Sequence, residues 1–217
     1  MTREVTGRYG GVDAADRQAE RRARLLDAAL ELLGTEGWQA ATVRAICSGA
    51  KLTPRYFYEG FTDRDELLLA LFDQIAQEAA AAVLEAVSRA PVDARAKAHA
   101  AIGAFVELVT DDPRKARVLF AEAMGSEPLT RRRFETLRMF AQLVAGQARD
   151  FYGMDDVADP LVEESALMLV GGLAEILLGW LDGIVHVTRE QLIDDCTALF
   201  VTTGEGAVRL VQGRARR

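Results

Sequence analysis

Residues 42–61, TVRAICSGAKLTPRYFYEGF, decide the fold of this chain. Apolar side chains recur at helical spacing from Val43 to Ala50, and Thr42 precedes them, where an N-cap is expected. The next two residues end this helix. Thr53 is placed to cap a second, very short helix, and a proline follows at the first helical position, where its missing N–H costs nothing. Two short helices joined by such a turn predict a helix-turn-helix unit.

The two sides of this unit differ in chemistry. Its interior is expected to hold Ile46, Cys47, Ala50, Leu52 and Phe57. The outward side of the second helix is expected to present Pro54, Arg55 and Tyr56. A short exposed helix with such side chains is typical of proteins that place a helix in the major groove of DNA.

The positions that specify this pattern are Ala50, Leu52, Thr53, Phe57, Tyr58 and Phe61. On these residues the segment resembles the DNA-binding domain of the tetracycline-repressor (TetR-type) family. Members of that family have alanine-glycine-valine-serine, three variable positions, an apolar residue, a tyrosine and a closing phenylalanine. The resemblance is strong over residues 17–75 and only architectural beyond them. It implies an all-α transcriptional regulator that binds double-stranded DNA.

Two residues depart from the family pattern. Lys51 stands where the family has glycine, so a left-handed turn there would cost about 1 kcal/mol. Gly60 stands where the family often has a histidine or tyrosine that contacts phosphate. The resemblance therefore implies that one phosphate contact is missing.

The composition predicts an all-α protein of the cytoplasm. Half of the 217 residues are hydrophobic and only 5 are proline, with little strand-like alternation. Cys47 and Cys196 are far apart in sequence, which fits a reducing compartment better than a disulfide framework. No apolar run follows Met1, so no signal peptide is expected. The longest uncharged apolar stretch, residues 165–174, is too short to span a membrane.

The negative charge of the chain lies in its C-terminal part. The net charge is −7, of which residues 1–64 contribute +1 and residues 65–217 contribute −8. The N-terminal part is only weakly basic, so DNA binding must depend on where its charges are placed more than on bulk attraction.

Three regions are predicted: a flexible arm at residues 1–16, a DNA-binding domain at 17–64, and a ligand-binding and dimerisation domain at 65–217. Helices are expected at residues 17–33, 62–89, 91–109, 112–125, 128–152, 159–181 and 188–211. The helix over 62–89 begins in one domain and ends in the other, so it could transmit movement between them.

The candidate DNA contacts fall into two groups. By the resemblance, Thr42, Tyr58 and Arg64 occupy phosphate-contact positions, and Lys51 and Thr53 belong to the same surface. Candidates for contacts to base edges are Arg44, Pro54, Arg55 and Tyr56, because arginine pairs bidentately with guanine in the major groove. The alternative is that Thr42 only caps its helix and that Arg44 and Arg55 contact only the DNA backbone.

The stretch LVGGLAEILLGWLDG, residues 169–183, is the second informative segment. Glycine inside a helix costs about 1 kcal/mol relative to alanine, and it is retained where another backbone must come close. Together with the last helix, the segment looks like the four-helix dimer interface of the family. The interface candidates are Leu169, Gly172, Leu173, Ile176, Trp180, Leu192 and Leu199. The alternative is an ordinary buried core helix.

The resemblance also implies a small-molecule inducer enclosed by the middle helices. The candidates to line its pocket are Phe105, Val109, Met124, Met139, Phe140 and Trp180, with Glu175 as a polar anchor. Aromatic and methionine side chains at this spacing also suit a plain core. Few positive charges are expected inward, which favours a neutral or cationic apolar ligand.

Enzymatic function is not expected. His99 and His186 have neither a nearby cysteine nor a paired ligand spacing, so no metal site and no catalytic triad is indicated. No cofactor is expected. The sequence predicts a homodimeric repressor released from a palindromic operator by a small molecule. An all-α carrier without DNA binding and an activator on the same fold remain alternatives.

Overall fold

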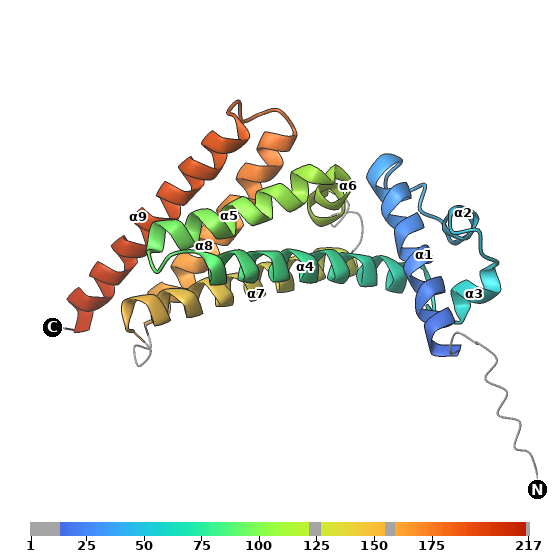
Figure 1. The fold of residues 1–217 in the computed structure, drawn as a ribbon, viewed down its shortest axis with the longest axis horizontal. Helices are drawn as coiled ribbons and strands as arrows, with labels where there is room; N and C mark the ends of the chain where they lie inside the picture. Colours follow the sequence, from blue (N-terminus) through green and yellow to red (C-terminus); the bar gives the residue numbers. More distant parts are fainter. Residues whose placement is uncertain (1–13, 122–126, 155–158, 216–217) are drawn as a thin grey trace, which may run out of the picture.

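The computed structural model describes residues 14–121, 127–154 and 159–215, and over these residues the chain is all-α (Figure 1). The elements, in chain order, are α1 (Ala14–Thr35), α2 (Val43–Gly49), α3 (Pro54–Tyr58), α4 (Arg64–Arg89), α5 (Ala94–Asp111), α6 (Pro113–Ala116), the π-helix η1 (Arg117–Ala121), α7 (Glu127–Tyr152), α8 (Pro160–Leu181) and α9 (Arg189–Ala215). The expected all-α class is confirmed.

Aspartates begin four of these helices. The carboxylates of Asp63, Asp93, Asp112 and Asp159 each accept a hydrogen bond from a backbone N–H in the first turn of α4, α5, α6 and α8. Such caps satisfy N–H groups that have no partner inside the helix. α6 and α8 in addition begin with proline, as their sequences predict.

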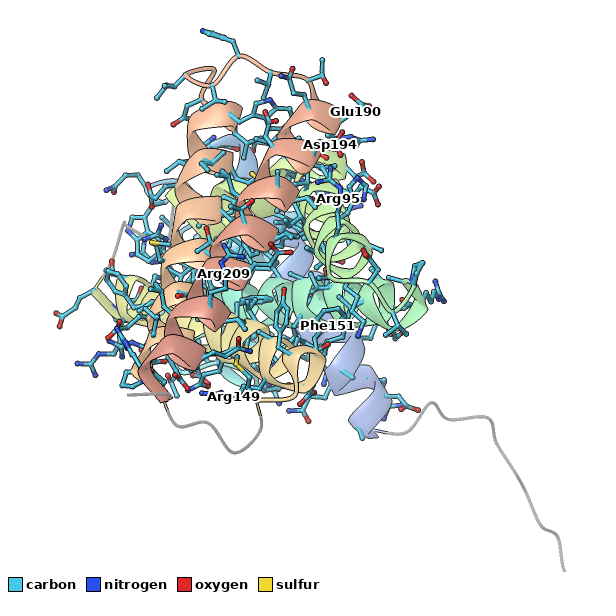
Figure 2. The ribbon with its side chains drawn as sticks, turned by 90° about the vertical axis from the view of Figure 1, so that its left-hand side faces the viewer. Arg95, Arg149, Phe151, Glu190, Asp194 and Arg209 are labelled. Atoms are coloured by element: carbon cyan, nitrogen blue, oxygen red, sulfur yellow. The ribbon has the colours of Figure 1, made fainter. Side chains whose placement is uncertain are left out.

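The helices form a small head and a larger body (Figure 1). The head consists of α1, α2 and α3, and α4 runs from it along the length of the body. α8 and α9 lie side by side on the face of the body that Figure 2 turns towards the viewer. One continuous core joins the two parts, from Leu25 in α1 to Cys196 in α9.

α4 is the helix that both parts share. It is long and apolar enough, by composition alone, to cross a membrane. Its apolar side chains from Leu67 to Ala79 are instead buried against the other helices. α4 is therefore a core helix. The predicted domain boundary between residues 64 and 65 falls in its first turn.

The predicted helix over 112–125 is divided in the structure. α6 ends at Ala116, and a π-helix follows it. In α7, Phe134 is 52% exposed, while Leu137 on the same helix packs against the core.

Candidate nucleic-acid interface and the cavity behind it

The head has the local geometry of a helix-turn-helix. Thr42 has extended backbone angles and its hydroxyl accepts a hydrogen bond from the N–H of Ala45 at 3.2 Å, which begins α2. Thr53 occupies the N-cap of α3, but its side chain makes no capping hydrogen bond. Phe57 is completely buried and holds α3 against the core of the head.

The turn between α2 and α3 depends on an unusual backbone conformation. Lys51 has φ 53°, the one positive φ at a non-glycine position among the described residues. The guanidinium of Arg24 in α1 donates hydrogen bonds to the carbonyls of Ala50 and Lys51. The departure from glycine at this position therefore places a lysine in left-handed backbone, and α1 braces the turn.

Two further arginines of α1 brace α3 and the residues after it. Arg21 lies 4.8 Å from the ring centroid of Tyr56 and 3.7 Å from a carboxylate oxygen of Glu59. Arg22 donates to the carbonyl of Gly60 at 3.3 Å. These positioning residues are not among the residues predicted from sequence, because their contacts join positions more than thirty residues apart.

The candidate base-contacting residues of α2 and α3 are all exposed. Arg44, Pro54, Arg55 and Tyr56 are exposed, and so is Tyr58. The side chain of Arg55 is 85% exposed, and its Nε lies 3.3 Å from Glu59 Oε1. We name the exposed residues of α2, the turn and α3 the head surface: Thr42, Arg44, Lys51, Thr53, Pro54, Arg55, Tyr56 and Tyr58.

Arg64, the ninth candidate, is the first residue of α4 and contacts residues outside the head surface. Its guanidinium is stacked 4.4 Å from the ring centroid of Trp38, and its Nε is 3.6 Å from Asp65. Its side chain is 30% exposed, so it is more constrained than Arg55.

α6 and η1 connect the head to the body. Arg114 of α6 donates to Glu31 of α1 at 2.6 Å and to its own N-cap, Asp112, at 2.8 Å. Arg117 of η1 donates to the carbonyls of Gly34 and Thr35 at the end of α1. Hydrogen bonds from Arg114 hold the pKa of Asp112 below its ordinary value. Ion pairs and hydrogen bonds therefore connect α6 and η1 to α1, and Gly34 of α1 packs closely against Arg114.

Lys115 ties the same segment to α4. Its Nζ lies 2.7 Å from Glu78 Oε2. Burial raises the pKa of Glu78, but the hydrogen bonds from Lys115 and Gln74 outweigh it, so the pKa is lowered overall. α6 therefore contacts both the first helix of the head and the helix that leaves it.

Two adjoining apolar cavities lie inside the body. The proximal cavity, nearer the head, has an empty volume of about 790 Å³ including its open side, and side chains of α4, α5, η1, α7, α8 and α9 line it. The distal cavity, towards the ends of α4 and α7, has about 1210 Å³ on the same measure. They share six lining residues: Val83, Ala101, Ile102, Phe140, Val144 and Phe200.

The ligand candidates are distributed around these cavities. Phe105 lines the proximal cavity, and Phe140 lines both. Val109 is fully buried in the core, Met139 is 39% exposed, and Trp180 donates its indole N–H to the carbonyl of Val187. These three residues line neither cavity. Met124 lies outside the described residues.

The cavity walls carry positive charge that the sequence analysis did not expect. Arg133 lines the proximal cavity with a side chain only 14% exposed, and it donates to Glu175 Oε1 at 2.8 Å. The predicted anchor, Glu175, is 65% exposed and contacts this arginine from outside. Lys97 lines the distal cavity. Because these two cations line the cavities, the lining does not favour a neutral or cationic ligand over an anionic one.

The dimer candidates divide between interior and surface. Leu192 is 2% exposed and belongs to the chain's own core, so it has no surface to offer a partner. Leu169 and Leu173 line the cavities, and Ile176 and Trp180 pack partly buried against the core. Gly172 and Leu199 are exposed. Further exposed apolar residues on the same two helices are Leu167, Met168 and Leu210.

Neither cysteine of the chain is exposed. Both Cys47 and Cys196 are buried as free thiols, and burial raises the pKa of each. In the described part of the chain no cluster of three or more His, Cys, Asp or Glu side chains could hold a metal ion.

A helix-turn-helix head joined to an all-α body with an apolar interior places this chain among helical regulatory proteins. A sequence model described as "Bacterial regulatory proteins, tetR family" matches residues 25–71, which span α1 to the beginning of α4. Over these residues the chain matches the TetR family of bacterial regulatory proteins, and the relatives that it resembles are HTH-type transcriptional regulators.

Two relatives are similar over part of the chain. The HTH-type transcriptional activator FasR of Mycolicibacterium smegmatis is 30% identical over 109 residues, which are 50% of this chain and 49% of the relative. The HTH-type nicotine-responsive transcriptional repressor HdnoR of Paenarthrobacter nicotinovorans is 31% identical over 94 residues, 43% and 48% of the two chains. The matched region spans about half the length of each relative.

A solved structure extends the likeness of the fold to most of the chain. The transcriptional regulator FadR of Bacillus subtilis, in complex with stearoyl-CoA, has a TM-score of 0.70 and covers 83% of this chain and 98% of its own. At 19% sequence identity the two proteins share a fold. The body is therefore of the same architecture as that of a known regulator.

Proposed function

We propose that this chain is a homodimeric repressor that binds a palindromic DNA operator through its head surface and leaves it when a small apolar molecule occupies the cavities. The observation that supports this most is the exposure of Arg55 and Tyr56 on α3, within the segment that matches the family. This proposed function requires no catalytic residue.

The head surface suits double-stranded DNA. α3 presents exposed side chains from its first turn, and the 85% exposed side chain of Arg55 can exchange its contact with Glu59 for a bidentate pair with guanine. The N-termini of α2 and α3, at Thr42 and Thr53, present backbone N–H groups suited to phosphate. Phosphate contacts would set the register, and the arginines would supply specificity.

A second copy of the chain is expected on α8 and α9, which lie side by side (Figure 2). Leu167, Met168 and Leu199 on these helices are about half exposed or more, and a Cβ at Gly172 would meet nothing within 4 Å. Apolar surface with room for close approach suits a helical partner. A two-fold pair would place two heads on half-sites about 34–36 Å apart, or a multiple of that.

The cavities supply the site for the inducer. FadR of Bacillus subtilis was solved with stearoyl-CoA, and HdnoR is nicotine-responsive, so relatives of this fold respond to or bind small organic molecules. The size and apolar walls of the two cavities favour a long ligand over a compact one. To release DNA, the ligand must prefer the conformation that does not bind the operator.

Relatives include both an activator and a repressor, so the direction of regulation needs a direct test. Genomic fragments retained by the purified protein would give the operator and its neighbouring genes. Transcription from that operator should rise when the gene for this cytoplasmic protein is deleted. A fall would make the protein an activator and overturn the repressor proposal.

The DNA-binding proposal has its own test. Fluorescence anisotropy of the selected duplex should show binding that weakens linearly on a log–log scale as salt is raised. The control is a duplex with both half-sites scrambled. An all-α carrier without DNA binding predicts no anisotropy change on either duplex at any salt concentration, and that result would refute the proposal.

A further inference from the structure

The two cavities together form a path along α7. Arg133 lines the proximal cavity and Tyr152 the distal one, and at 1.5 Å per residue they lie about 28 Å apart along the helix axis. The shared side chains, among them Phe140, make a waist between the two spaces. A long and narrow apolar path suits a single extended aliphatic chain better than a compact ring system.

The two ends of this path differ in polarity. The proximal end is almost entirely apolar, and its one guanidinium, Arg133, is engaged by Glu175. The distal end includes Lys97, Gln147, Tyr152 and Ser165. Polar groups at one mouth and an apolar interior give the path a direction, with the head of the ligand outermost.

Lys97 gives the distal mouth its charge. Its Nζ lies 6.0 Å from the ring centroid of Phe151, which is labelled in Figure 2, and within the described ranges it forms no ion pair. Arg95, two residues earlier, is instead engaged by Asp194 at 3.9 Å. An ammonium that lines a cavity without a carboxylate partner is suited to an anionic ligand head.

The proximal end of the path contacts η1, the π-helix that connects the body to the head. Leu119 and Phe120 of η1 line the proximal cavity, and Arg117 of the same five-residue π-helix donates to the carbonyls at the end of α1. π-helices occur frequently at functional sites. None of these η1 residues lines the distal cavity.

From this placement we propose that the inducer is a long unbranched aliphatic carboxylic acid, with its carboxylate at Lys97, and that its chain length determines the response. A short chain fills the distal cavity without contacting η1. A long chain passes the waist, displaces Leu119 and Phe120, and so disturbs the contact between η1 and α1. This inference rests on the proposed function, because release of DNA is its readout.

The experiment compares octanoate, laurate and palmitate as free acids. Calorimetry measures occupancy of the full-length protein, and anisotropy of the operator duplex measures release. Octanoate at saturation should leave the duplex bound, whereas palmitate should release it. Equal release by all three ligands at equal occupancy would overturn the chain-length proposal.

One pair of variants separates binding in the distal cavity from release through the proximal cavity. Ala79→Leu narrows the proximal cavity, and it should abolish release by palmitate while octanoate binds as before. Ala98→Leu, in the distal cavity, should weaken the binding of all three acids. If Ala79→Leu proves unstable in a thermal melt, Ala76→Leu in the same cavity takes its place. Unchanged release in a stably folded proximal variant would refute the role of η1.

The head group is tested by charge. Lys97→Ala should weaken the binding of palmitate about tenfold and leave the binding of hexadecanol unaffected, because only the acid carries charge. The matched control is Arg95→Ala, which removes a cation from the same helix that is already paired with Asp194. Equal loss for acid and alcohol would overturn the anionic head. Failure of the proposed function appears separately, as absence of DNA binding by the ligand-free protein.

Discussion

Gly34 and Arg114 approach so closely that a Cβ at Gly34 would lie 2.4 Å from the Cβ of Arg114 and 2.9 Å from its Cα. α1 and α6 therefore pack against each other at a position that only glycine can occupy. Because backbone is involved, rotation of a side chain cannot relieve the contact. The head and the body are joined at this point, and Glu31 closes it with an ion pair.

The first prediction concerns this glycine. Gly34→Ala should lower the free energy of unfolding by about 2 kcal/mol, because overpacking outweighs the higher helix propensity of alanine. The measurement is urea denaturation monitored by circular dichroism. Gly103→Ala in α5 is the control: a Cβ there meets nothing within 4 Å, so it should stabilise the chain by up to about 1 kcal/mol. Two variants of equal stability would contradict this account.

Much of the head could be predicted from sequence, because its signals are local. Caps, a proline at the first helical position and the spacing of buried side chains specify α2 and α3 within a few residues. The bracing by Arg21 and Arg24 could not be predicted, since it joins residues more than twenty positions apart. The contact of Gly34 with Arg114 depends on the crossing of two helices, which no local pattern encodes.

The body was less predictable for a related reason. Helical spacing indicates which side chains turn inward, but not whether they meet in a filled core or line a cavity. Val109 and Phe105 lie four residues apart in α5, yet one is in the core and the other lines the proximal cavity. Leu192 likewise has the pattern of an interface residue but is buried within its own chain.

The second prediction concerns specificity. Arg55→Ala should weaken operator binding by about 1–3 kcal/mol and relax preference at one base position in each half-site. Its side chain is 85% exposed, so the fold should be unaffected. Binding is measured on a set of duplexes with single substitutions, with Arg89→Ala, far along α4, as the control. An equal loss on every duplex would assign Arg55 to phosphate and not to a base.

The third prediction concerns the partner surface. Leu199 is 54% exposed on α9, and a carboxylate placed there would be buried without a partner in a dimer. Leu199→Glu should therefore shift the protein to monomers at micromolar concentration, as measured by sedimentation velocity. Val92→Glu, at an 88% exposed loop position, should leave the dimer intact. A wild-type protein that is already monomeric would refute the dimer itself.

The fourth prediction concerns the turn. Lys51 adopts φ 53°, a conformation that costs a non-glycine residue roughly 1–2 kcal/mol. Lys51→Gly removes this cost but makes the unfolded chain more flexible, so a net stabilisation of up to about 1 kcal/mol is expected. Thermal denaturation measures it, and Lys51→Ala, which keeps the strain and removes the charge, is the control. If glycine and alanine gave the same stability, the turn would not be strained at this residue.

The fifth prediction concerns acid. The hydrogen bonds from Arg114 lower the pKa of Asp112 below its ordinary value of 3.8, so the folded state favours the charged carboxylate. A depressed pKa contributes stability that is present above the ordinary value and is lost as the pH falls through the lowered one. Asp112→Asn can still cap α6 but carries no charge, so it should be less stable than wild type at neutral pH. Urea denaturation at a series of pH values should show the two proteins converging as the pH falls from about 4 through the lowered pKa of Asp112, where the folded wild-type carboxylate also becomes neutral. A stability difference that did not shrink in acid would show that Asp112 acts through the cap alone and that its ion pair with Arg114 adds nothing to the link between head and body.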